Sequence, residues 1–180
     1  MKNRIKLILI ISLLAGIAVI SCKRIDEYPI EPVIKYIGFD TIYNATTGKS
    51  ERGILRFEYT DGDGDLGLAK KDTFPPFNPG SKYYYNLIID YYEVQNGEEK
   101  PVTLTFWDAA NEKFDTVYLS ARIPQLTPKG SNRSISGDIY DTLFIYNYSS
   151  PYDTLFFKFR IVDRALHESN TEQTDYIVRK

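Results

Sequence analysis

The sequence predicts an all-β protein, an antiparallel β-sandwich of about seven to nine strands. Three observations favour this class. The 180-residue chain contains 15 Tyr and 10 Phe, and aromatic residues fit the half-buried surface of a pleated sheet. Segments in which apolar and polar residues alternate recur between clusters of turn-forming residues. From residue 23 onward, no stretch has the residue spacing of an amphipathic helix.

The first 22 residues are typical of a secretion signal and not of a folded domain. Three basic residues, Lys2, Arg4 and Lys6, precede or begin an apolar run over residues 5–20. At about 16 residues this run is shorter than the roughly 20 that a membrane-spanning helix needs, although such a helix is the alternative interpretation. A secretion signal is removed and takes no part in the fold, so residues 1–21 are predicted to be a signal peptide.

The end of the apolar run indicates where the protein resides. Val19-Ile20-Ser21-Cys22 resembles the bacterial lipobox, in which branched and small residues precede an invariant cysteine. The resemblance implies that Cys22 is lipidated, becomes the first residue of the mature chain and anchors it in the outer membrane. Several acyl chains make such an anchor stable, because each buried methylene contributes about 0.8 kcal/mol. Residues 22–32 contain two prolines and are expected to form a tether.

Four strands are expected in the first part of the domain, over residues 33–39, 53–60, 82–94 and 101–107. The second is the clearest, because Leu55, Phe57 and Tyr59 alternate with polar residues, as in a strand with one buried face. Asn96-Gly97 is the strongest short hairpin signal in the chain and is expected to join the last two of these strands.

Four further strands are expected over residues 113–123, 138–148, 153–162 and 174–178. The third of them has the cleanest alternation, with Leu155, Phe157 and Phe159 on one side. A loop rich in Pro, Gly, Ser and Asn separates the first from the second. Because strands follow one another without intervening helices, the pattern favours an antiparallel sandwich over alternating βαβ units, within one domain over residues 33–180.

Composition argues against several classes of function. Cys22 is the only cysteine and His167 the only histidine, so neither a disulfide nor a zinc site with several His or Cys ligands is expected. No nucleophile motif of the G-x-S-x-G kind accompanies His167, and we expect no enzymatic activity. Removal of Lys2, Arg4 and Lys6 with the signal peptide leaves 19 of the 22 basic residues against 24 acidic ones. This excess of negative charge argues against nucleic acid as a partner.

The sharpest local motif is Asp61-Gly62-Asp63-Gly64-Asp65. Carboxylates at alternating positions, with glycine between them, can curl around one hard cation, and oxygen ligands at about 2.3–2.6 Å suit Ca²⁺. The spacing is similar to the start of an EF-hand loop, in which Asp72 would be the last ligand. The sequence therefore predicts a calcium site whose candidate ligands are Asp61, Asp63, Asp65 and Asp72.

Two features separate this loop from an EF-hand. Leu66 stands where an EF-hand needs glycine for its turn, and the flanking segments alternate as strands do. We therefore expect a calcium loop of another kind at a strand end, with a structural role for the ion. The alternative is a solvated acidic turn whose charge is countered by Lys70 and Lys71, because Asp and Gly favour turns for backbone reasons alone.

A second candidate site is a dense group of aromatic residues between positions 74 and 107. Tyr and Trp give large amphipathic contacts at low entropy cost, so binding surfaces use them. The Pro-rich loop over residues 73–80 is expected to present two Phe side chains beside the acidic motif. The alternative is ordinary core and cross-strand packing. The candidate ligand-binding residues, for a glycan or a protein, are Phe74, Phe77, Tyr84, Tyr92 and Trp107.

Two segments resemble known bacterial families. Ile161-Val162-Asp163, followed by Ser169-Asn170, is similar to the final hairpin of bacterial immunoglobulin-like domains, although Leu166-His167 replaces the usual Gly-Asn turn. Residues 57–67 resemble a segment of uncharacterised secreted lipoproteins of the Bacteroidota. The resemblance implies an immunoglobulin-like β-sandwich and a place in the cell envelope, and it implies no activity.

These observations favour a non-catalytic lipoprotein of the cell envelope that acts as a binding or scaffolding module, with Ca²⁺ in its Asp-rich loop. One alternative is a surface protein that captures a glycan or a peptide with an aromatic face. The other is a purely structural envelope component whose Asp-rich loop binds no metal. Contact with the membrane is expected through the lipid anchor.

Overall fold

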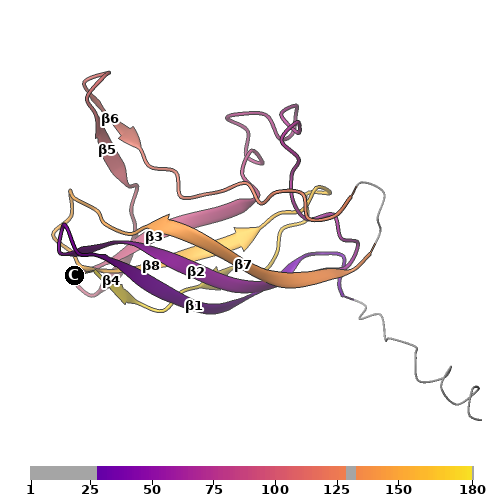
Figure 1. Cartoon of the computed structure of the whole chain (residues 1–180), viewed down its shortest axis with the longest axis horizontal. Helices are drawn as coiled ribbons and strands as arrows, with labels where there is room; N and C mark the ends of the chain where they lie inside the picture. The colour runs from indigo at the N-terminus through magenta and orange to yellow at the C-terminus, as the bar shows by residue number, and fades with distance from the viewer. Residues whose placement is uncertain (1–27, 129–132, 180) are drawn as a thin grey trace, which may run out of the picture.

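The computed structural model describes residues 28–128 and 133–179, in which the chain forms ten β-strands and no helix (Figure 1). Two antiparallel sheets enclose one core, so the predicted all-β sandwich is confirmed. The strand count slightly exceeds the predicted value of about seven to nine. The predicted signal peptide and Cys22 lie outside the described residues. Within the described ranges, no helix could cross a membrane.

The first sheet contains three strands in the order β1-β2-β7. These strands are β1 (Val33–Asn44), β2 (Lys49–Asp61) and β7 (Ile135–Phe144). The pairing of β1 with β2 shifts register twice, near Gly38 and near Tyr43. The pairing of β2 with β7 runs without interruption from Arg52 opposite Phe144 to Asp61 opposite Ile135. The sheet thus has one irregular edge and one regular edge.

The second sheet has the order β10-β8-β3-β4, with β9 also paired to β8. Its strands are β3 (Leu87–Gln95), β4 (Glu98–Pro101), β8 (Thr154–Ile161), β9 (Glu172–Gln173) and β10 (Ile177–Val178). The predicted turn at Asn96-Gly97 joins β3 to β4, and both residues have positive φ, 56° and 85°. Two successive positive φ values are what a two-residue hairpin of the Asn-Gly type requires.

The core lies between the two sheets and is built from the alternation that the sequence displays. Leu55 and Phe57 of β2 face Phe157 and Phe159 of β8, and all four side chains are fully buried. The rings of Phe57 and Phe159 lie 5.1 Å apart. Burial of each such side chain stabilises the fold by about 1.5–3 kcal/mol, so these two strands hold the sandwich together.

One predicted strand pair leaves the sandwich. The chain was expected to return to the sheet over residues 101–107 and 113–123; β4 pairs with β3 and Ala121 bridges to Leu87, but the residues between Leu104 and Val117 leave the sheet. After the buried Leu104, β5 (Thr105–Asp108) and β6 (Lys113–Thr116) form a separate hairpin that projects from the sandwich (Figure 1). Its aromatic side chains pack on each other instead of on the core, with the rings of Trp107 and Phe114 at 5.1 Å.

Candidate functional site

The Asp-rich loop follows β2 at one end of the sandwich and is organised around Asp61. This residue is fully buried. Its carboxylate accepts the backbone N–H of Gly64 at 3.3 Å and that of Leu66 at 2.8 Å. An aspartate that accepts amide groups three and five residues later curls the backbone around itself. The carboxylate of Asp61 is therefore the internal support of the loop.

Glycine is required in this loop because other backbone segments approach it closely. The N–H of Gly62 donates to the carbonyl of Pro29 at 2.8 Å, and a Cβ at position 62 would overlap that carbonyl. Gly64 has a φ of +70°, and a Cβ there would overlap the carbonyl of Arg133. The loop is thus held from two sides by segments that are distant in sequence.

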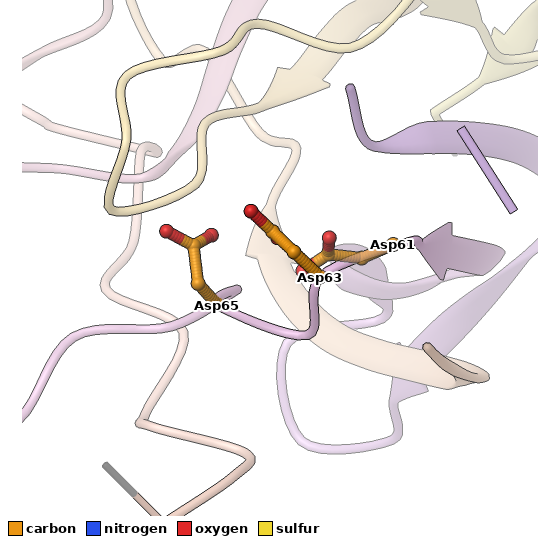
Figure 2. A group of neighbouring side chains, drawn as sticks. All are labelled: Asp61, Asp63 and Asp65. Carbon is orange, nitrogen blue, oxygen red and sulfur yellow. The ribbon is translucent and has the colours of Figure 1, made fainter. Parts of the chain in front are cut away.

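Three aspartates converge in this loop. Asp61, Asp63 and Asp65 each provide one carboxylate oxygen within 4.8 Å of the others. Figure 2 shows the side chains of Asp63 and Asp65 on the same side of the loop, with Asp61 behind Asp63. Oδ1 of Asp63 is buried and has no hydrogen-bond partner among the described residues. The sequence motif therefore corresponds to a spatial group of carboxylates.

Negative charge dominates this end of the molecule. Burial, together with the nearby charges of Asp63 and Asp65, raises the pKa of Asp61 to about 6. Burial and the charges of Asp163 and Asp63 also raise the pKa of Asp65. The cation that acts on Asp65 is Arg164, whose backbone N–H donates to Asp65 Oδ1 at 3.3 Å.

The remaining acidic residue of this end already has a partner. Asp163 is fully buried in its side chain, and its Oδ2 lies 2.8 Å from Nδ1 of His167. This contact raises the pKa of His167. His167 is thereby engaged with Asp163, and the ion pairs of the described residues include neither Asp61 nor Asp63.

The donor set suits a hard cation, because it consists of carboxylate oxygens. Calcium takes six to eight oxygen ligands in general, so backbone carbonyls or water would have to complete the shell of an ion held by three aspartates. Asp72, the fourth predicted ligand, is not part of this group. Its Oδ2 accepts the N–H of Ala69 at 2.8 Å and closes a local turn. The structure thus brings together three of the four predicted ligands.

The predicted aromatic residues lie on separate elements. Phe74 in the loop before β3 is 77 % exposed, and Trp107 on β5 is 54 % exposed. Phe77 and Tyr84 are half-buried, and the guanidinium of Arg122 lies 4.9 Å from the ring centre of Tyr84. Tyr92 stacks on Phe156 of β8, with 4.9 Å between ring centres. The five residues therefore do not form one continuous cluster of ring contacts.

Several exposed aromatic residues were not among the predicted ligand-binding residues, including Phe114 and Tyr118 on or beside the hairpin. Tyr118, at the base of the β5–β6 hairpin, is 70 % exposed and stacks on Tyr85 at 6.2 Å. Phe114 is 65 % exposed and contacts Trp107. The sequence did contain a signal for Tyr118. Val117 and Leu119 were expected on the inner face of one strand, so Tyr118 between them should face outward. The hairpin and its base are thus one of several places where aromatic side chains are exposed, since Tyr43, Tyr140, Tyr148 and Tyr176 are exposed elsewhere.

Another buried carboxylate lies at the opposite end of the sandwich, near the start of β2, and was not predicted. Glu93 is 1 % exposed. It accepts hydrogen bonds from Asn147 Nδ2 at 2.9 Å and from Ser150 Oγ at 2.6 Å. The hydroxyl of Tyr91 links this cluster to the carbonyl of Ile145, the residue whose N–H donates to the carbonyl of Glu51.

Arg179 completes the cluster around Glu93. Its guanidinium donates to the carbonyls of Ser150 and Tyr152 at 2.9 Å and also to that of Asn147. It thereby holds the turn that supplies the hydrogen-bond donors of Glu93. Nothing in the local sequence of β3 signals this arrangement, because Asn147 lies 54 residues from Glu93. We assign this cluster a structural role.

Comparison of the chain with protein-family models, with curated proteins and with solved structures found no match.

Proposed function

We propose that the protein is a non-catalytic lipoprotein of the cell envelope that acts as a binding or scaffolding module and is stabilised by Ca²⁺ at its Asp-rich loop. The observation that carries the calcium part is the convergence of Asp61, Asp63 and Asp65 within 4.8 Å. Close carboxylates repel one another, and a bound cation relieves that repulsion. Asp163 and Arg164 would shape the surroundings of the ion, and Asp72 would take no part.

The position of the tether is consistent with such a role. The described chain begins at residue 28, next to the Asp-rich loop, because Gly62 donates to the carbonyl of Pro29. The β5–β6 hairpin lies toward the other end of the sandwich (Figure 1). With Cys22 lipidated in the outer membrane, the Asp-rich end would be near the membrane and the hairpin would be presented away from it.

Calorimetric titration of the purified protein with Ca²⁺ tests the metal site. We expect saturable binding that is lost in the double variant Asp63→Asn, Asp65→Asn. Asp61 is left intact in this variant because it supports the loop. Asp72→Asn is the matched control and should bind as the parent protein does. Absence of heat, with a melting temperature unchanged by chelator, would establish the alternative of a structural component that binds no metal.

Substitution of Cys22 tests the anchor separately. We expect the parent protein to incorporate labelled fatty acid and to sediment with the outer membrane. Cys22→Ser should do neither, because the lipid is attached through the thiol. Equal membrane association of the two proteins would contradict the lipoprotein assignment and leave the calcium test unaffected.

A second candidate function is the capture of a glycan or a peptide by exposed aromatic residues. The observation that favours it is the β5–β6 hairpin, on which Trp107 and Phe114 contact each other and remain more than half exposed. Exposed aromatic rings offer stacking faces to sugars and apolar contacts to peptides. Trp107 is the only tryptophan, so its fluorescence reports on binding directly. A ligand of this surface should change that emission, and Phe114→Ala should weaken the effect.

A further inference from the structure

One side of the sandwich is less completely closed than the other. β7 is the last strand of the first sheet and, among the described residues, pairs only with β2. The opposite edge of that sheet is covered. Asn170 exchanges two hydrogen bonds with the backbone of Ile34 in β1, at 2.8 and 2.9 Å, and Glu172 accepts the N–H of Tyr36 at 3.4 Å. Side chains thus take the place of a neighbouring strand at β1 only.

A groove runs beside β7 where this side remains open. It has a volume of about 360 Å³ and lies between residues 117–121 and residues 141–144, and Arg52 of β2 also lines it. We call it the β7 groove. Val117, Leu119 and Ala121 line it and are only partly buried, although they pack against the core. The core is therefore incompletely covered along the edge of β7.

The edge of β7 has the regularity that strand addition requires. Its register with β2 is continuous over its full length, whereas β1 is interrupted by two bulges. Natural proteins use bulges and edge charges to prevent unwanted pairing; β7 has no bulge, and its edge charges would disfavour any added segment that lacks charges of opposite sign. An extended segment paired with β7 would place every second side chain over the β7 groove.

The charges on β7 specify which segment would fit. Asp141 is half-buried on the core side of the strand, and Asp138 is exposed on the outer side opposite Glu58. The ion pairs of the described residues include neither Asp138 nor Asp141. An added strand therefore meets a carboxylate without a cationic partner on each face, and opposite charges across a strand pair are stabilising.

We propose that the β7 groove binds an extended segment of a partner protein by strand addition, and that this segment carries Lys or Arg residues opposite Asp138 and Asp141. This inference names the class of partner for the proposed binding module. It rests on that proposed binding role and not on the calcium site or the lipid anchor. A second copy of the chain fits less well, because pairing of two β7 strands would bring four aspartates to one edge.

Titration with a synthetic strand tests the inference on the full-length protein in detergent. The probe is the fluorescein-labelled peptide VTKTVKITV, whose antiparallel pairing with residues 135–143 puts its two Lys opposite Asp141 and Asp138. We expect saturable binding by fluorescence anisotropy. Asp141→Asn should weaken it about three- to tenfold, since a partly desolvated charge pair is lost. Asp90→Asn, an exposed aspartate of β3, is the control and should change little.

A charge exchange makes the test specific. Asp141→Lys should lose the peptide above and gain affinity for VTETVEITV, in which Glu replaces both Lys. Binding of the two peptides with equal affinity to the parent protein would overturn the inference. Absence of binding would overturn it too, and dimer formation by Asp141→Asn in sedimentation would then show that the aspartates block self-association. Calcium binding is measured by a separate titration. Failure of strand addition at β7 and failure of the calcium site can therefore be told apart.

Discussion

Glu93 at one end of the sandwich and Asp61 at the other are both buried carboxylates, and they differ in what surrounds them. Glu93 accepts hydrogen bonds from the neutral donors Asn147 and Ser150, and Arg179 fixes the turn that carries these donors. Asp61 accepts two backbone N–H groups but lies next to Asp63 and Asp65, whose charges oppose its own. One end is balanced in charge and the other is not.

This difference separates a structural cluster from a candidate ligand site. A buried carboxylate with all its hydrogen bonds made stabilises the fold and needs nothing further. A group of carboxylates with too few donors stores electrostatic repulsion, which a cation can relieve. The two ends should therefore respond in opposite ways when a carboxylate is removed or when Ca²⁺ is added.

The largest effect is expected at the balanced end. Glu93→Ala leaves the buried donors of Asn147 and Ser150 without an acceptor and should lower the free energy of unfolding by about 3 kcal/mol. Denaturant unfolding should give the same loss with Ca²⁺ and with chelator. Glu98→Ala, at an exposed position of β4, is the control and should change stability by less than about 0.5 kcal/mol. A Ca²⁺-dependent loss in Glu93→Ala would break the comparison.

Backbone fit of the Asp-rich loop should give the next largest effect. Gly64→Ala introduces a Cβ at a φ of +70° that would overlap the carbonyl of Arg133, and we expect it to cost about 2–3 kcal/mol. Gly80 has a φ of +83° and open space around it. Gly80→Ala should therefore cost only about 1 kcal/mol, from the backbone conformation alone. Thermal unfolding of both variants measures the difference, and equal losses would show that the loop tolerates displacement.

The unbalanced end should also make stability depend on pH. Asp61 holds its proton up to about pH 6 in the folded protein, against an ordinary pKa of 3.8. The folded state binds more protons in this interval, so the free energy of unfolding of the metal-free protein should fall as pH rises from about 4 to 6. We expect a decrease of about 1–2 kcal/mol, and a smaller decrease in Asp61→Asn, in which the raised pKa of Asp65 still acts.

His167 provides the control for this pH profile. The contact with Asp163 raises the pKa of His167. Its stabilisation of the folded protein is complete below about pH 6.5 and is lost as the pH rises through the pKa of the folded state. His167→Gln should therefore remove a change above pH 6.5 and keep the decrease between 4 and 6. If His167→Gln also lost the decrease between pH 4 and 6, that decrease could not be attributed to Asp61.

The smallest effect is expected on the hairpin. Trp107 is 54 % exposed and contacts Phe114 outside the core, so Trp107→Ala should reduce stability by no more than about 0.5 kcal/mol. Phe157→Ala, in the fully buried core, should cost about 3–5 kcal/mol. Chemical denaturation compares the two. A large loss in Trp107→Ala would mean that the hairpin supports the fold and would weaken its candidacy as a binding surface.

The parts that the sequence predicted well are those in which neighbouring residues carry the information. Leu55 and Phe57 in β2, and Phe157 and Phe159 in β8, alternate because one face of each strand is buried. The convergence of Asp61, Asp63 and Asp65 also follows from local spacing. Asp72 was expected to join them, but the chain turns at Ala69 and uses its carboxylate to close that turn.

The parts that were missed depend on contacts between distant segments. Asn147 reaches Glu93 only because β3 and the segment after β7 meet at one end of the sandwich. The aromatic residues of segment 105–116 are typical of sheet strands, so they gave no sign that the chain leaves the sheet after Leu104. Aromatic residues on an exposed hairpin and in a buried strand look alike in sequence.

The stability of Asp63→Asn, measured by denaturant unfolding with chelator and with Ca²⁺, tests the contrast between the two ends most directly. Oδ1 of Asp63 is buried and has no hydrogen-bond partner in the described part of the chain, so removal of its charge should relieve repulsion. We expect the variant to be about 0.5–1 kcal/mol more stable than the parent in chelator. The parent alone should gain stability with Ca²⁺, about 2.7 kcal/mol at a concentration 100 times Kd. A variant that is less stable in chelator, beside a parent indifferent to Ca²⁺, would contradict the account.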